Sequence, residues 1–250
     1  MQKKLYFCGK FYDMAPISKA QIKFIRSLQH KKFRDEAGMF VAEGSKCVEE
    51  LKKGFELVLE VTPNNASETE IAQMSGLKTP QGVIAVFKKH ITNDKSQIAN
   101  GELVLALDGI QDPGNLGTII RTCDWFGVHQ IICSSDTADC YNPKVVQATM
   151  GSLTRVNLTY TDLPQWLAQQ QCPIYGTLLN GKNIYQSKIE NQESRIIVMG
   201  NEGNGISQAV RELITHPILI PSYPENAETS ESLNVAIATA IVLAEFRRLG

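Results

Sequence analysis

The sequence predicts an α/β protein with a mostly parallel sheet that is covered by helices on both faces. Over residues 102–250, short apolar runs alternate with segments of helical periodicity. These runs are continuous, which is typical of parallel strands buried on both faces. A polar stretch without periodicity, residues 88–102, divides the 250-residue chain. We therefore expect one domain over residues 1–95 and a second over residues 102–250.

The first domain is predicted to be a small α/β unit. Ile22, Ile25 and Leu28 share one face of a helix over residues 18–29, and Ser18 is its expected N-cap. A second helix is expected over residues 45–54, where Gly54 ends it. Short strands are expected over residues 38–44, 56–62 and 82–88.

In the second domain, the apolar strand over residues 103–108 leads into a helix over residues 116–126. Asn142 and Pro143 mark the start of another helix, as its cap and first residue. The other expected elements are strands over residues 129–134, 173–179, 195–200 and 217–221, helices over residues 163–171 and 207–214, and a last helix from about Ser232. Ligands bind such sheets at the carboxyl ends of the strands, so we expect the functional site there.

Composition excludes several classes of protein. The longest apolar run is shorter than the roughly 18 residues that a membrane span needs. The N-terminal segment has lysines but lacks the apolar core of a secretory signal, so we expect a cytoplasmic protein without a membrane partner. The six cysteines form no CxxC pair and have no histidines at zinc spacing. They are interpreted as reduced packing residues, and no metal site is expected.

The net charge is −1, but the charged residues are unevenly distributed along the chain. Residues 1–34 carry nine Lys and Arg residues against a single acid, Asp13. Such a block can bind phosphates, or it can be the solvated face of a helix, and charge alone does not decide between the two.

Three strand ends carry unusual polar segments: "QDPGNLGTIIR" over residues 111–121, "VMGNEGNGIS" over residues 198–207, and residues 219–234. Neither nucleotide-binding fingerprint is present. Gly200, Gly203 and Gly205 run G-x-x-G-x-G, which is the wrong order for a dinucleotide fold, and the first segment lacks the lysine of a P-loop. On spacing alone, the glycines could simply form turns and helix caps. Arg121 nevertheless follows its corner by a little over one helical turn, and a planar guanidinium there suits a phosphodiester.

Together, these segments resemble the three motifs of the SpoU (TrmH-like) class of RNA 2′-O-ribose methyltransferases, in the SPOUT superfamily. "DPGNLGTIIRTCDWFG" is similar to the first motif, "IVMGNEGNGIS" to the second, and "ILIP" with "ESLNVAIATAIVLAEF" to the third. The resemblance covers about 150 residues, 102–250. More weakly, the first domain resembles the ribosomal-protein-L30e-like substrate-binding domain of members that act on ribosomal RNA. A segment at residues 222–231 is longer than in many relatives and is expected to form a lid or an RNA-contacting loop.

The resemblance implies a C-terminal trefoil knot and a homodimer formed through the C-terminal domain. The last helix, apolar nearly all round, suits burial in that interface. It also implies S-adenosylmethionine as the cofactor, held largely by backbone groups. The positions that match the cofactor-binding residues are Thr177, Leu178, Gly200, Ile220 and Leu233.

The resemblance further implies a catalytic set beside the reacting ribose, formed by Asn115, Arg121, Glu202, Ser232 and Asn234. A guanidinium is a poor base. We therefore expect Arg121 to hold a phosphate and stabilise the developing alkoxide electrostatically, while Asn115, Ser232 and Asn234 orient the ribose. Glu202 is expected to anchor the second corner or to pair with Arg121.

The predicted function is methyl transfer from S-adenosylmethionine to a ribose 2′-hydroxyl in structured RNA, with 23S-type ribosomal RNA as the favoured substrate. Two alternatives remain open from the sequence. One is a methyltransferase acting on transfer RNA, whose family members often lack the first domain. The other is an RNA-binding protein that keeps the fold without catalysis, for which damaged motifs would be expected.

Overall fold

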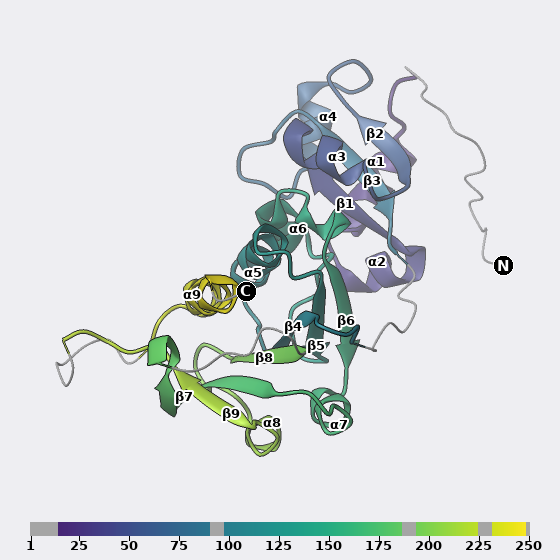
Figure 1. Cartoon of the computed structure of the whole chain (residues 1–250). Coiled ribbons are helices and arrows are strands. Elements are labelled where there is room, and N and C mark those ends of the chain that lie inside the picture. The colour runs from purple at the N-terminus through teal and green to yellow at the C-terminus, as the bar shows by residue number, and fades with distance from the viewer. Residues whose placement is uncertain (1–14, 91–97, 187–193, 225–231, 249–250) are drawn as a thin grey trace. The chain divides into compact units, whose positions relative to one another are not determined.

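The computed structural model describes residues 15–90, 98–186, 194–224 and 232–248. The chain forms two compact units, Met1–His90 and Ile91–Gly250, and each is described by itself. Figure 1 shows the elements of both. Residues 91–97 of the expected linker, and residues 225–231 of the expected lid or loop, lie outside the described residues. In the part of the chain that is described, no helix is long and apolar enough to cross a membrane.

The first unit is built on an antiparallel sheet, with β3 between β1 and β2. Its elements are α1 (Lys19–Ser27), α2 (Lys31–Ala37), β1 (Met39–Glu43), α3 (Ser45–Leu51), β2 (Leu57–Val61), α4 (Glu68–Met74) and β3 (Ile84–Lys88). α1 and α4 pack together, and their apolar residues Ile22, Ile25, Ile71 and Met74 form one core cluster with the sheet. The helical face expected from Ile22, Ile25 and Leu28 is thus the buried face.

Side chains close both ends of α1. Ser18 caps α1 in a capping box with Gln21, as expected for Ser18. α2 was not expected, and it explains one member of the basic block. Arg34 is buried and donates hydrogen bonds to the carbonyls of Leu28 and Gln29 at 3.0 and 2.9 Å, so it closes the end of α1.

The second unit is a parallel sheet in the strand order β6-β5-β4-β8-β7-β9. This confirms the expected α/β class with a mostly parallel sheet. Its strands are β4 (Leu103–Asp108), β5 (Gln130–Ser134), β6 (Asn157–Thr161), β7 (Ile174–Asn183), β8 (Arg195–Gly200) and β9 (His216–Leu219). Its helices are α5 (Pro113–Trp125), α6 (Pro143–Thr149), α7 (Leu163–Leu167), α8 (Gln208–Arg211) and α9 (Val235–Arg248), with short 3₁₀ turns at Ser152–Thr154 and Ile184–Gln186.

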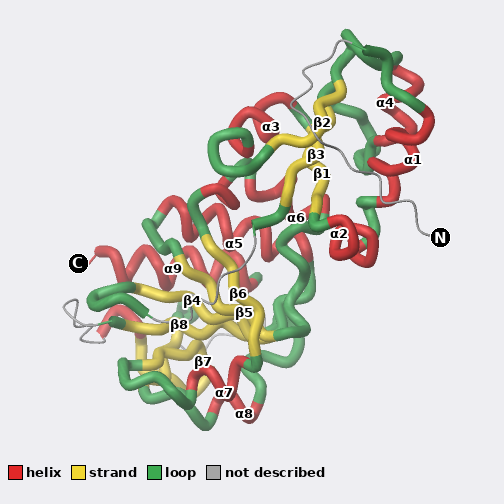
Figure 2. Tube along the Cα trace, turned by 90° about the vertical axis from the view of Figure 1, so that its right-hand side faces the viewer, coloured by secondary structure: helices red, strands yellow, loops and turns green. Residues whose placement is uncertain are grey.

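Helices cover both faces of this sheet, with α5, α6 and α9 on one face and α7 and α8 on the other (Figures 1 and 2). Trp166 and Leu167 of α7 and Val210 of α8 pack with alternate residues of the central strands. Gly117 brings α5 close to α6, because a Cβ at this glycine would lie 2.4 Å from the Cβ of Ala148.

α5 and α9 are joined at corresponding ends. At their beginnings, Asn234 donates a hydrogen bond to Asn115 at 3.0 Å. At their ends, Arg247 donates to the carbonyls of Phe126 and Gly127 at 2.7 and 2.8 Å. Since both helices carry these contacts in the same order, they run parallel beside one another.

The last turn of α5 is held by an ion pair. Asp124 accepts hydrogen bonds from Arg155 and from the Ser152 hydroxyl, with distances of 2.7 to 3.0 Å. The Arg155 guanidinium holds the pKa of the Asp124 carboxyl below its ordinary value. The pair therefore remains ionised across the neutral range.

Several boundaries differ from the expectations. The last helix begins at Val235 instead of near Ser232, because Asn234 accepts hydrogen bonds from the backbone N–H groups of Ala236 and Ile237. α8 has four residues where eight were expected. The strand expected at residues 173–179 continues to Asn183 as β7.

Candidate active site

The first two polar corners begin side by side. β4 and β8 are adjacent parallel strands, and Asp108 at the end of β4 pairs in register with Gly200 at the end of β8. After Asp108 the chain turns into α5, which Asp112 caps by accepting a hydrogen bond from the Asn115 N–H at 2.8 Å. After Gly200 it makes a tight turn in which Asn201 and Gly205 exchange backbone hydrogen bonds at 2.9 Å.

A chain of side-chain hydrogen bonds joins all three corners. Asn115 donates to Glu202 at 2.5 Å and accepts a hydrogen bond from Asn234 at 3.0 Å. Each residue comes from a different corner: Asn115 from the start of α5, Glu202 from the turn after β8, and Asn234 from the cap of α9. The structure thus brings together three of the five predicted catalytic residues. Glu202 binds Asn115, which fits its expected role as an anchor of the second corner.

Arg121 and Ser232 lie outside this hydrogen-bonded chain. Both are exposed, and neither makes a hydrogen bond or ion pair that the described residues reveal. Six residues separate Arg121 from Asn115, which places the two about 120° apart around the helix axis. Arg121 instead shares its face of α5 with Trp125, whose side chain is 85% exposed.

Two residues that the sequence interpretation missed hold the second corner in place. Asn201 donates from its Nδ2 to the carbonyl of Gly109 at 2.7 Å. Its Oδ1 accepts from the N–H groups of Gly203 and Asn204 at 2.9 and 3.1 Å. Asp108 is buried, and one of its carboxylate oxygens accepts from the Ser207 N–H at 2.7 Å. The turn that carries Glu202 is therefore bound to the end of β4 at both of its ends.

The role of Asn201 could have been predicted from the sequence, because Asn201 directly follows a buried strand and precedes a glycine-rich turn. Asparagine often stabilises such turns through its own side chain.

The predicted cofactor-binding residues belong to three adjacent strands and to the segment before α9, and those of β7 directly follow the last residue that pairs with β8, Gly176. Thr177 and Leu178 belong to β7, Gly200 ends β8, and Ile220 directly follows β9. These three strands are neighbours in the order β8-β7-β9 and are parallel, so their carboxyl ends share one edge of the sheet. Leu233 is half exposed and precedes the cap of α9.

The residues at this edge suit an uncharged adenosine group. Thr177, Leu178 and Ile220 are partly buried, and Leu179 beside them is 81% exposed, so apolar surface and a hydroxyl group remain accessible. At Gly200, the reason for the residue type is packing of the backbone and not contact with a ligand. A Cβ there would lie 2.3 Å from the backbone carbon of Gly205, so only glycine lets the turn fold back on β8.

The same motifs occur in known proteins. Residues 102–244 match the model of the SpoU rRNA Methylase family. The chain belongs to the SpoU rRNA methylase family. Residues 19–62 match the MRM3-like substrate binding domain. The family predicted from the three motifs is confirmed, and with it the expectation of a methyltransferase.

Among curated proteins, this SpoU chain is 32% identical over 246 residues to the 23S rRNA (guanosine(2553)-2′-O)-methyltransferase RlmP of Bacillus subtilis. That alignment covers 91% of this chain and 96% of the relative.

Two solved structures are also similar. A putative RNA methyltransferase of the TrmH family from Porphyromonas gingivalis is 36% identical, with a TM-score of 0.83, over 94% of this chain and 100% of its own. The AdoMet-bound rRNA methyltransferase from Sinorhizobium meliloti is 30% identical, with a TM-score of 0.82, over 94% of this chain and 96% of its own. Both similarities extend over nearly the whole SpoU chain.

Proposed function

We propose that this protein transfers a methyl group from S-adenosylmethionine to a ribose 2′-hydroxyl in 23S-type ribosomal RNA. The observation that carries the proposal is the Asn234–Asn115–Glu202 hydrogen-bonded chain, which unites the three family motifs at the carboxyl edge of one parallel sheet. Polar groups held in fixed positions at this edge can orient a sugar hydroxyl. The named activity of the Bacillus subtilis relative, which aligns with nearly the whole chain, supports the substrate class.

S-adenosylmethionine would be held along β7, at the ends of β8 and β9 and in the segment before α9, by Thr177, Leu178, Gly200, Ile220 and Leu233. When bound, S-adenosylmethionine supplies a methyl group that its sulfonium charge activates for nucleophilic attack. The protein's own residues then have little covalent chemistry to perform, and positioning of the ribose becomes their main contribution.

Arg121 would bind a phosphate of the substrate and stabilise the negative charge that develops on the ribose oxygen as the proton of the hydroxyl passes to solvent water. Its guanidinium extends from α5 with no partner among the described residues, so it is available to a phosphate. Asn115 and Asn234 would orient the ribose, Ser232 would assist them from the segment before the α9 cap, and Glu202 would fix the amide of Asn115.

The larger assignments belong to the same proposal. Residues 1–95 form a ribosomal-protein-L30e-like RNA-binding domain, and residues 102–250 form the methyltransferase domain with a trefoil knot. The protein acts as a homodimer through its C-terminal domain. A ribosomal substrate places it in the cytoplasm.

The test uses large-subunit ribosomal RNA from cells that lack this protein. Incubation with the purified protein and S-adenosylmethionine is expected to add a 2′-O-methyl group at a defined nucleotide, which ribose-methylation mapping detects. Arg121→Ala is expected to slow transfer about 100-fold or more, by analogy with the loss of one oxyanion-stabilising donor. Calorimetry should show its S-adenosylmethionine affinity unchanged, because the proposed role of Arg121 is toward the RNA.

Two outcomes would overturn the proposal. Methylation of transfer RNA alone would exclude the ribosomal substrate. Binding of ribosomal RNA without any transfer, at saturating S-adenosylmethionine, would favour the non-catalytic alternative.

A further inference from the structure

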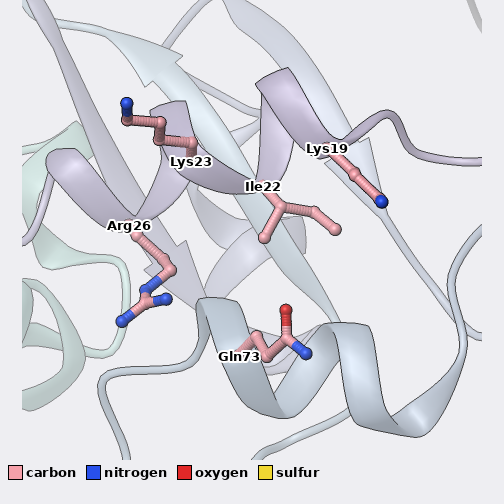
Figure 3. Close-up of a pocket in the computed structure, with 5 residues that line it drawn as sticks. All are labelled: Lys19, Ile22, Lys23, Arg26 and Gln73. Carbon is pink, nitrogen blue, oxygen red and sulfur yellow. The ribbon is translucent and has the colours of Figure 1, made fainter.

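α1 and α4 of the first unit enclose a surface hollow of about 570 Å³. Lys19, Ile22, Lys23 and Arg26 line it from α1, and Gln73 lines it from α4. In Figure 3, Lys19, Ile22 and Arg26 extend from α1 on the side of α4, Gln73 extends from α4 toward α1, and the Lys23 ammonium points away. The hollow therefore combines positive charge at its rim with an apolar residue and an amide between the charges.

The charges on α1 serve no visible purpose in the fold. Lys19, Lys23 and Arg26 are exposed, and none forms an ion pair within the described part of the chain. Five other lysines of the same unit differ, because carboxylates pair with Lys31, Lys52, Lys53, Lys88 and Lys89, whereas Lys32, Lys46 and Lys78 also lack an ion pair among the described residues.

The position of Lys19 also opposes helix stability. It occupies the first position of a nine-residue helix whose first turn has no acid. A cation there interacts unfavourably with the positive end of the helix dipole. Across the hollow, the carboxylate nearest to Gln73 in the α4 sequence is Glu70, which is already bound to the N–H and hydroxyl of Ser67 at 2.9 and 2.8 Å. An anion is therefore a suitable occupant of the hollow.

We infer that the α1–α4 hollow binds the sugar–phosphate backbone of the RNA substrate. Lys19 and Arg26 each neutralise a phosphate, and the Gln73 amide hydrogen-bonds to the nucleotide between them above Ile22. The two cations are seven residues apart, about 10 Å along the helix axis, so they engage different phosphates. Because these contacts reach the backbone, they position the RNA without reading its sequence. This inference rests on the proposed function and assigns RNA binding by the first unit to one particular face.

The experiment compares full-length variants for binding to large-subunit ribosomal RNA from cells that lack the protein, over a series of salt concentrations. Lys19→Ala with Arg26→Ala removes two charges and keeps a strong helix former at both positions. Loss of two phosphate contacts should reduce the salt slope of log affinity by about 1.4–1.8 and weaken binding about 10-fold or more near 0.1 M salt. The KM for RNA should rise while kcat at saturating RNA stays at the wild-type value.

Two controls separate the effect of charge at the α1–α4 hollow from the effect of the total charge of the first unit. Lys53→Ala with Lys88→Ala also removes two exposed charges from the first unit, and its salt slope and affinity should match the wild type. Gln73→Ala should weaken binding with the salt slope unchanged, because it removes a hydrogen bond without a charge. Circular dichroism and the melting temperature confirm that each variant folds.

An unchanged salt slope for the Lys19/Arg26 variant, or an equal loss in the Lys53/Lys88 control, would overturn the inference while wild-type methylation still supported the proposed function. If the wild-type protein instead methylates no RNA, the proposed function fails, whatever the binding data show.

Discussion

At the scale of single residues, the site depends on side chains that satisfy the backbone of polar turns. Asn201 makes three hydrogen bonds, one to the carbonyl of Gly109 and two from the turn that presents Glu202. Glu202 in turn accepts a hydrogen bond from Asn115. The position of a proposed active-site carboxylate is thus set by a neighbouring residue that needs no contact with the substrate.

We expect Asn201→Ala to lower kcat at least 10-fold and to lower the free energy of unfolding by about 1–3 kcal/mol, because the carbonyl of the buried Gly109 loses its donor. Compared with Asn201→Ala, Asn201→Asp should lose less kcat and less unfolding free energy. Its side-chain oxygen can still accept from the N–H groups of Gly203 and Asn204, although the donor to Gly109 is lost. Steady-state kinetics and urea unfolding measure the two effects. A positioning role requires kcat to fall with little change in KM for RNA; normal kcat in a destabilised Asn201→Ala protein would show that Asn201 only stabilises the fold.

At the scale of elements, close helix packing places Asn115. Gly117 lies in the second turn of α5, where a Cβ would come within 2.4 Å of the Ala148 Cβ and 2.9 Å of the Val145 carbonyl oxygen on α6. Asn115 lies on the same helix, two residues earlier. Packing therefore explains Gly117 in the first corner, where spacing alone had allowed the glycines to be turns and helix caps.

Gly117→Ala tests this packing, because helix propensity and overpacking change the stability of the protein in opposite directions. Helix propensity alone favours alanine by about 1 kcal/mol. Overpacking against α6 costs about 1–3 kcal/mol and displaces α5. We expect the cost of overpacking to exceed the gain in helix propensity, so that the urea midpoint falls and methyl transfer is reduced. Gly114→Ala, one turn earlier at an exposed position, is the control: its Cβ would meet only a side-chain atom, the Asp112 Oδ1 at 3.0 Å, and stability should change by less than about 1 kcal/mol. A Gly117→Ala protein more stable than the wild type would show that α5 and α6 can separate without cost.

The elements predicted correctly are those with a continuous apolar run or a strong cap. β4, β5 and β8 are buried along their whole length, and Ser18 and Asn142 cap helices as expected. α2, α4 and β6 were missed because their apolar patterns are weak: one residue of α2, two of α4 and one of β6 are buried. α4 could have been found, since Ser67 and Glu70 have the spacing of a capping box.

The candidate site was predicted in composition but not in connectivity. Motif resemblance pointed to Asn115, Glu202 and Asn234, and the parallel sheet explains why their strand ends meet. The order of the contacts depends on how strands pair across the sheet, and local sequence does not encode this order. Arg121 lies outside the Asn234–Asn115–Glu202 chain, and its place beside the reacting ribose stays a prediction.

At the scale of the whole molecule, the two units have complementary proposed tasks. The first unit presents cations on α1, and the second presents the polar site at one edge of its sheet. Phosphate contacts supply affinity without sequence specificity, so target choice is left to the fit of one nucleotide at the site. Such a division explains how a protein with a net charge of −1 can still bind RNA.

The exposed side of α9 supports the proposed homodimer. Ile237 is 56% exposed, Ala244 is exposed and Ile241 is partly exposed, so an apolar stripe follows the helix one turn at a time. On the neighbouring α5, Trp125 is 85% exposed. A helix that is apolar on its outer side needs a covering partner.

We expect light scattering to give twice the 27.7 kDa mass of one chain. Ile237→Glu should shift the protein toward the single-chain mass, because a carboxylate would be buried without a counter-charge in the interface. Gln208→Glu, which adds the same charge to the exposed start of α8 on the opposite face of the sheet, should remain dimeric. If the dimer completes the site, Ile237→Glu should also lose methyl transfer, and activity should recover at high protein concentration by mass action. A wild-type protein with the single-chain mass at about 10 µM would contradict the dimer, since obligate interfaces of this apolar kind persist at that concentration.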